Sequence, residues 1–284
     1  MKKKRTNTAV SVHQKLLRIA KSSDKFFNAI LLRYFQERFL YRLSISSYRE
    51  SFVLKGALLL LAFDIQSERP TKDIDFLGVT TPEDEVELIE DIKSILSIQL
   101  DDGIVFDGKS IEVQNIRKEE LKKGVRVFFR AFLGKANTRM HIDIGSGDRI
   151  IPDSITLDFP VLLDEMPIPN LLAYNAETAI AEKYEAIVNL GFTTSRMKDF
   201  YDIYYLIKHH NLNLEVLKEA IIIVFQNRGT DINKRHLIYT EEYVNDAINN
   251  KQWESFIKRI EVSTKVSFGD CIESIKGYIE GLLS

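Results

Sequence analysis

Asp73 and Asp75, two aspartates separated by one residue, have the type and spacing in this chain that most directly suggest chemistry. They lie in Asp73-Ile74-Asp75-Phe76-Leu77-Gly78, where polar and apolar residues alternate as in a half-buried strand. Residues i and i+2 of a strand point to the same face, so the two carboxylates would converge. Such a pair repels unless a cation lies between the carboxylates, and its oxygen ligands suit Mg²⁺ bound with substrate phosphates. A D-x-D pattern alone is more often a surface or turn feature.

Asp143 is a candidate third carboxylate. It lies in Met140-His141-Ile142-Asp143-Ile144, which has the apolar neighbours of a second strand. In a mixed sheet this strand can lie beside the first and direct Asp143 toward the same metals. Two metal ions about 3.5–4 Å apart can activate a hydroxyl and stabilise a leaving pyrophosphate. Alternatively, Asp143 only caps the turn at Gly145-Ser146-Gly147.

Cationic candidates come from the second half of the chain. Lys183 follows apolar helical positions and could act as a point charge on a triphosphate, or simply pair with a neighbouring glutamate. Arg196, Asp199 and Asp202 are spaced three apart on one expected helix face. By its pattern alone, this ladder favours a structural set of ion pairs.

The elements that would position these residues divide the chain near residue 170. Before it we expect one or two amphipathic helices over 11–43 with a break at Ser22-Ser23-Asp24, a buried helix after Lys55-Gly56-Ala57, and a helix from Thr81 to about Leu96. Short strands follow over 104–106, 110–113, 125–132 and 139–144, with a hairpin-type turn at Asp107-Gly108 and then a proline-marked irregular connection (Pro152, Pro160, Pro167 and Pro169). Helices are expected over 176–190, 197–210, 213–227, 240–260 and 268–283. The predicted domains are an α/β lobe with basic N-terminal helices, 1–170, and a helical lobe, 171–284.

Composition excludes several other classes. The single cysteine, Cys271, rules out an intrachain disulfide and a cysteine-based metal site, and the five histidines lack metal-ligand spacing. No apolar run approaches the roughly 20 residues needed to cross a bilayer, and the basic start lacks the apolar segment of a secretory signal. We therefore expect a cytoplasmic protein without a membrane partner.

Charge is distributed unevenly along the chain. Residues 1–55 hold 13 Lys and Arg against three acids, a net charge of +10, whereas the whole chain carries −2. This asymmetry suggests either a basic face for nucleic acid or an acidic partner, or simply a solvated helical surface.

Several motifs, in order over roughly residues 11–284, together resemble the AbiEii/AbiGii family of nucleotidyltransferase toxins. They are Phe52-Val53-Leu54-Lys55-Gly56-Ala57, Arg69-Pro70-Thr71-Lys72-Asp73-Ile74-Asp75, Glu177-Thr178 with Ala181-Glu182-Lys183-Tyr184-Glu185-Ala186, and Arg196-Met197-Lys198-Asp199-Phe200-Tyr201-Asp202. The resemblance implies an α+β fold of the DNA polymerase β-like nucleotidyltransferase type, a mixed sheet with flanking helices, followed by a helical C-terminal lobe.

The resemblance also implies roles for individual residues. Asp73 and Asp75 would hold the metals, with two Mg²⁺ expected, and Asp199 or Asp202 would complete the site. Gly56 and Ala57 would line the triphosphate pocket, where many relatives carry serine or glycine in place of Ala57. The residues expected to bind the nucleotide are Lys55, Gly56, Ala57, Arg69, Thr71, Lys183, Arg196 and Lys198. Asp143 is added as a metal ligand and catalytic residue by its spacing, not by the resemblance.

The function implied is metal-dependent transfer of a nucleotide from an NTP to an acceptor, with release of pyrophosphate. The expected acceptor is the 3′ end of tRNA, and the expected partner is an antitoxin encoded nearby in a toxin–antitoxin or phage-defence system. The alternatives are transfer to a protein or a small molecule, and a non-catalytic nucleotide-binding partner.

Overall fold

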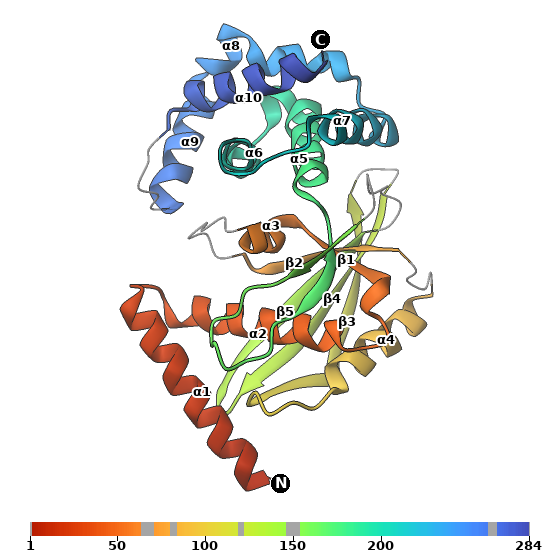
Figure 1. Ribbon diagram of the computed structural model, residues 1–284, viewed down its shortest axis with the longest axis vertical. Helices are drawn as coiled ribbons and strands as arrows, with labels where there is room; N and C mark the ends of the chain where they lie inside the picture. The colour runs from red at the N-terminus through yellow and green to blue at the C-terminus, as the bar shows by residue number, and fades with distance from the viewer. Residues whose placement is uncertain are drawn as a thin grey trace. The chain divides into compact units, whose positions relative to one another are not determined.

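The computed structural model describes residues 2–63, 71–79, 84–118, 122–145, 154–260 and 266–283. They fall into two compact units with a boundary after Ala173. The first holds the sheet and the N-terminal helices, and the second is helical (Figure 1). No helix in these stretches is long and apolar enough to cross a membrane.

The first unit is built on a seven-stranded mixed sheet whose order is β3-β4-β5-β2-β1-β7-β6. The strands are β1 Phe52–Lys55, β2 Asp73–Gly78, β3 Ile104–Lys118, β4 Lys122–Leu133, β5 Ala136–Gly145, β6 Ile155–Asp158 and β7 Asn170–Ala173. β2 runs parallel to β5 and antiparallel to β1, while β4 is antiparallel to both β3 and β5. The expected α+β class, with a mixed sheet, flanking helices and a helical C-terminal region, is confirmed.

Aromatic side chains join the helices to one face of this sheet. The unit contains α1 Lys2–Ser22, α2 Phe27–Ser44, α3 Gly56–Leu59 and α4 Glu85–Ser97. Phe39 of α2 is buried with its ring centroid 5.6 Å from that of Phe129 on β4 and 6.4 Å from that of Phe76 on β2. Because side chains alternate along a strand, the neighbours of Phe76 and Phe129 in sequence point to the opposite face. That opposite face receives Asp75.

The second unit consists of helices. They are α5 Ala176–Leu190, α6 Met197–His209, α7 Leu214–Arg228, α8 Glu241–Val244, α9 Ala247–Ile260 and α10 Phe268–Leu283, with 3₁₀ turns over Gly191–Thr193 and Ile232–Tyr239. Asn175 and Asn213 cap α5 and α7 by accepting hydrogen bonds from the backbone N–H groups of Thr178 and Val216. The ranges predicted for this half agree closely, except that the single helix expected over 240–260 is divided into α8 and α9.

Two local predictions for the first unit are wrong, and a third falls outside the described residues. Asp107-Gly108 is not a hairpin turn, because β3 continues through it with a register shift against β4 between Asp107 and Glu112. The cap of α4 is Asp84, whose side chain accepts a hydrogen bond from the Val86 N–H, and the expected start at Thr81 lies outside the described residues. The proline-marked connection is also more regular than expected, since it contains β6 and β7.

The expected break between the first two helices is present. α1 ends at Ser22 and α2 begins at Phe27, and between them Asp24 adopts a left-handed conformation with φ of 52°. That conformation is tolerated better by aspartate than by most other residues, because its short polar side chain can bond locally.

Candidate active site

Asp73 and Asp75 share one face of β2, while Ile74 and Phe76 between and after them are buried in the core. Both carboxylates belong to half-buried residues, and the Asp73 side chain retains 43% exposure. The i, i+2 spacing therefore puts two acidic groups on the same face of the sheet, away from the apolar core.

Gly56 brings backbone unusually close to Asp75. It follows β1, has a φ of 72°, and begins the short helix α3. A Cβ atom at this position would lie 2.1 Å from Asp75 Oδ2, a separation that no real Cβ contact permits. Glycine is required here both by the backbone conformation and by the carboxylate packed against it.

Asp143 lies beside Asp75 on the neighbouring parallel strand, in the register that pairs Asp75 with Asp143. Its side chain is 8% exposed and accepts two hydrogen bonds from Arg126 of β4, each 2.6 Å long. The expectation that the two acidic strands lie side by side is confirmed, whereas the role of Asp143 in catalysis stays a prediction. The turn that Asp143 would cap in the alternative interpretation lies outside the described residues after Gly145, and the described contacts of the Asp143 carboxylate are those to Arg126.

His141 makes the corresponding contact with the first aspartate. It pairs with Asp73 in the β2–β5 register, and its Nε2 lies 2.6 Å from Asp73 Oδ1. His141 and Asp143 of β5 therefore each lie beside one member of the D-x-D pair.

The acidic side chains and Arg126 form one electrostatic group. Hydrogen bonding to Asp143, together with the charges of Asp143, Asp73 and Asp75, raises the pKa of Arg126 despite some loss of solvation. With three carboxylates and one guanidinium, the group carries a formal charge of −2 when His141 is neutral.

The donor set suits a magnesium ion at the D-x-D pair. Asp73 and Asp75 offer carboxylate oxygens on a shared face, the ligand type that Mg²⁺ prefers beside substrate phosphates. A carboxylate has about four lone-pair sites, so Asp143 retains acceptor capacity beyond its two bonds to Arg126. Among the described residues, no group of three or more His, Cys, Asp or Glu side chains is already close enough to hold a metal.

The predicted residues of the second unit come together in a separate cluster. Lys183 of α5 donates hydrogen bonds to Asp199, at 3.0 Å, and to Asp202, at 2.7 Å, both on α6. All three side chains are largely buried, and Arg196 Nε lies 3.2 Å from the other oxygen of Asp199. The spacing-based interpretation of this ladder as an ion-pair set agrees with these contacts, and the expected contact of Lys183 with a triphosphate remains a prediction.

Charge pairing determines the protonation of this buried cluster. Burial by itself would lower the pKa of Lys183, but the charges of Asp202 and Asp199 outweigh that effect and raise it. Burial likewise opposes ionisation of Asp199, whereas Lys183, Arg196 and Lys198 hold the pKa of Asp199 below its usual value. Lys183 and Asp199 are thus a charged pair.

The remaining predicted nucleotide-binding residues are divided between the two units. Lys55, the last residue of β1, pairs in register with Asp75, and Ala57 is half-buried in α3. Thr71 is anchored by a 3.1 Å hydrogen bond from Gln36 of α2 to its carbonyl. Lys198 lies on α6, and Arg69 lies outside the described residues.

Arg126 and His141 are the residues beside the aspartates that the sequence did not single out. Arg126 alternates with apolar residues in Val125-Arg126-Val127-Phe128-Phe129, which places it on the polar face of a strand. Its pairing with Asp143 depends on the register between β4 and β5, which alternation alone does not specify.

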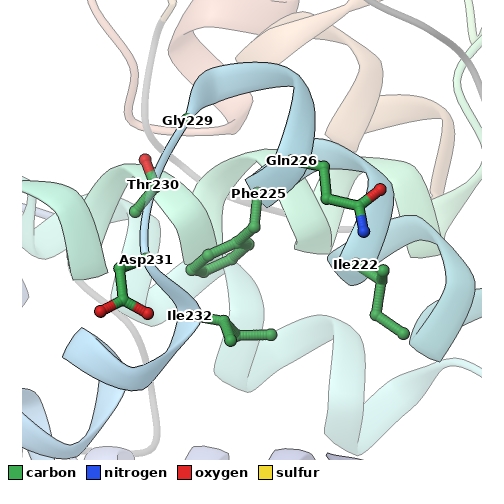
Figure 2. A pocket seen from close by; sticks show the side chains of 7 residues that line it. All are labelled: Ile222, Phe225, Gln226, Gly229, Thr230, Asp231 and Ile232. Atoms are coloured by element: carbon green, nitrogen blue, oxygen red, sulfur yellow. The ribbon is translucent and has the colours of Figure 1, made fainter.

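A pocket of 370 Å³ lies in the second unit, between the last turn of α7 and the 3₁₀ turn that follows. Figure 2 shows the Phe225 ring with Ile222 and Ile232 lining it, near Thr230 and Asp231. None of the predicted site residues is among the residues that line this pocket.

A mixed sheet that presents paired aspartates beside a glycine turn has the arrangement expected of a nucleotidyltransferase. The chain belongs to the AbiEii family, whose model, described as "Nucleotidyl transferase AbiEii toxin, Type IV TA system", matches residues 38–274. A comparison with curated proteins finds no match.

Two solved structures from Helicobacter pylori show a distant likeness to the chain. One, a putative nucleotidyltransferase, is 15% identical, covers 90% of this chain and 94% of its own, and gives a TM-score of 0.48. The other, JHP933, is also 15% identical, covers 90% and 98%, and gives a TM-score of 0.42.

Proposed function

We propose that this protein transfers a nucleotide from an NTP to the 3′ end of tRNA in a magnesium-dependent reaction, and that an antitoxin partner neutralises it. The observation that carries the proposal is the shared face of Asp73 and Asp75, with Asp143 in register on the next strand. Membership of the nucleotidyl transferase toxin family supports the same reaction class and implies the antitoxin.

Magnesium held by Asp73 and Asp75 would supply positive charge to the phosphates of the bound NTP. The chain itself positions these ligands: Gly56 lets α3 begin directly against Asp75, and β5 places His141 beside Asp73. A site built on strands holds its ligands more precisely than one built on loops.

The reaction is an in-line displacement at the α-phosphate. A bond forms between the acceptor hydroxyl oxygen and the α-phosphorus, and the bond from that phosphorus to the bridging oxygen breaks, so that pyrophosphate leaves. The hydroxyl proton passes to Asp143 or to one carboxylate of the D-x-D pair. Lys183, supported by Arg69 or Lys198, neutralises the pyrophosphate in this proposal.

The experiment is incubation of the protein with Mg²⁺, total tRNA and each of the four α-³²P-labelled NTPs in turn. We expect label on tRNA with at least one NTP, and a loss of several orders of magnitude for Asp75→Ala with the fold retained. Asp164→Ala is a matched control, because it removes a carboxylate that is exposed and outside the site.

Three outcomes would contradict the proposal. A near-normal rate for Asp75→Ala would remove the D-x-D pair from the mechanism. Label on protein or on a small molecule, with none on tRNA, would reassign the acceptor. Metal-dependent NTP binding without any product would indicate a non-catalytic nucleotide-binding protein.

A further inference from the structure

A row of planar side chains continues the sheet face that carries the D-x-D pair. Asp73 pairs with His141 on β5, and His141 pairs with Phe128 on β4, so all three side chains point to the same side. Arg139, two residues before His141, lies on the same face of β5. We call Phe128, Arg139 and His141 the Phe128 platform.

The platform is held in place by contacts on two sides of the ring. Arg139 Cζ lies 4.0 Å from the Phe128 ring centroid, so the guanidinium covers the ring. Its Nη2 donates a 2.5 Å hydrogen bond to Glu112 of β3, which fixes its orientation. The His141 ring lies 5.4 Å from Phe128 and is tilted by 48°.

These side chains remain available to a ligand. The Arg139 side chain is 49% exposed, and Phe128 is half-buried although its neighbours Val127 and Phe129 are fully buried in the core. An exposed cation–π pair contributes only about 0.5–1 kcal/mol to folding, so stability alone is a weak reason to place a large aromatic on this face.

The position of the platform relates it to the acidic site. Phe128 is two strand spacings from Asp73, which corresponds to about 10 Å. If the ribose hydroxyl of a terminal nucleotide lies near the D-x-D pair, the base of that nucleotide or of the one before it would reach this distance. Aromatic rings and arginine planes are the surfaces on which unpaired RNA bases stack.

We propose that the Phe128 platform binds the last bases of a single-stranded RNA 3′ end, which stack on the exposed Arg139 guanidinium that lies over the Phe128 ring. This inference rests on the proposed function, because it concerns the acceptor of that reaction. Charges near the platform nearly balance: Arg130 and Arg139 face Asp107 and Glu112 across the sheet. Stacking rather than phosphate attraction therefore dominates recognition at this position.

The test compares Phe128→Leu with the wild-type chain in equilibrium binding of total tRNA without NTP. Leucine keeps an apolar side chain on β4 but removes the ring. The measurement is then repeated with tRNA whose single-stranded 3′ end has been trimmed by an exonuclease. We expect Phe128→Leu to weaken binding of intact tRNA about tenfold and to leave binding of trimmed tRNA within about twofold of wild type.

Two further variants make the test specific. Arg139→Lys keeps the positive charge but removes the planar guanidinium, and it should weaken binding of intact tRNA several-fold. Phe132→Leu is the matched control, because Phe132 lies on the same strand and face, is half-buried, and pairs with Asn137 instead of His141. It should bind both tRNA forms as the wild type does, and NTP binding should be unchanged in all three variants.

The platform assignment would be overturned if Phe128→Leu weakened binding of intact and trimmed tRNA by the same factor. It would also be overturned if Phe132→Leu weakened binding of intact tRNA as much as Phe128→Leu does. Binding and labelling of a protein in place of tRNA would overturn it too. Failure of the proposed function is distinguishable, because it appears in the labelling assay of the unaltered platform, as transfer that does not depend on Asp75 or as no label on tRNA. If only the platform assignment is wrong, transfer to tRNA still depends on Asp75, but Phe128→Leu binds tRNA as tightly as the wild type does.

Discussion

At the scale of single residues, Gly56 illustrates how the backbone constrains the chemistry around it. The turn from β1 into α3 needs a positive φ, and the space where a side chain would project is already filled by the Asp75 carboxylate. The glycine is therefore tied to the position of one aspartate and not only to the turn.

Gly56→Ala should separate these two requirements. A left-handed alanine costs about 1–2 kcal/mol, and its Cβ must also displace Asp75 from its present position. Because a shift of about 1 Å at a reacting group can cost 100-fold in rate, we expect transfer to fall by about that factor or more. The rate of tRNA labelling and the free energy of unfolding in urea measure the two effects.

Gly229→Ala is the control for backbone strain alone. Gly229 has a φ of 63° with no atom within 4 Å of the added Cβ. The free energy of unfolding of Gly229→Ala should be lower than that of the wild type by a similar amount, about 1–2 kcal/mol, while transfer continues at the wild-type rate. Equal transfer rates in the two variants would show that the contact between Gly56 and Asp75 has no catalytic consequence.

Glu37 of α2 is fully buried and sets a pH dependence of stability. Burial raises the pKa of Glu37 to about 7, because the opposing effects of Arg33, the Leu162 N–H and Arg38 are smaller. A carboxyl whose pKa is higher in the folded state contributes stability below its unfolded pKa of about 4.5. That contribution is lost as the pH rises to about 7.

The free energy of unfolding of the wild type, relative to that of Glu37→Gln, should thus fall by about 3 kcal/mol between pH 4.5 and 7 and change little above that range. Urea unfolding of both proteins across this pH range measures the difference, in which other titrating groups cancel. A difference that rises with pH would mean that the neighbouring arginines outweigh burial.

At the scale of elements, α5 and α6 are joined by a charged contact in place of a purely apolar one. Lys183 donates to Asp199 and Asp202 while all three side chains are largely buried. Removing one partner of a buried ion pair leaves an uncompensated charge, which costs more than the pair itself gains.

Lys183→Met should therefore destabilise the chain by about 3–5 kcal/mol, as measured by urea unfolding. Lys208→Met is the control, because Lys208 is an exposed lysine of α6 and its loss should stay within about 0.5 kcal/mol. A loss below about 1 kcal/mol for Lys183→Met would contradict the structural role.

A second variant separates the structural role from nucleotide binding. Combining Lys183→Met with Asp199→Asn and Asp202→Asn removes the charges together and should recover most of the stability. If Lys183 also contacts the triphosphate, the recovered protein still binds NTP weakly. If that protein binds NTP with wild-type affinity, the role of Lys183 is limited to holding α5 and α6 together.

Elements were predictable where the local pattern alone determines them. Apolar spacing located α5 and α7, and alternation located β2 with both aspartates on one face. The turn predicted at Asp107-Gly108 is absent, because a turn-like dipeptide can also be accommodated in a strand that changes register. β6 and β7 were missed, since four-residue strands among prolines carry little alternation.

The candidate site was predictable only up to the point where strands must be paired. The D-x-D pair follows from a spacing within one strand, but the neighbours of Asp143 depend on register between strands. Arg126 and His141 therefore emerge from the structure alone. Register is set by burial of one whole face of the sheet, which is a property of the assembled core.

At the scale of the whole molecule, the uneven charge offers a test of where the acceptor binds. The chain carries −2 overall, yet residues 1–55 carry +10. Arg18, Lys21 and Lys25, near the end of α1, are all exposed. If these cations contact RNA phosphates, each releases counterions on binding and steepens the salt dependence of affinity.

Replacing Arg18, Lys21 and Lys25 by glutamate should reduce the slope of log affinity against log salt by about 2–3, since each phosphate contact contributes about 0.7–0.9. The matched control replaces Lys251, Lys258 and Arg259 of α9, which are also exposed, and so changes the net charge equally. Its slope should stay near that of the wild type when tRNA binding is titrated with salt. Equal reductions in both triple variants would mean that tRNA responds to total charge, and that the basic N-terminal region is an ordinary solvated surface.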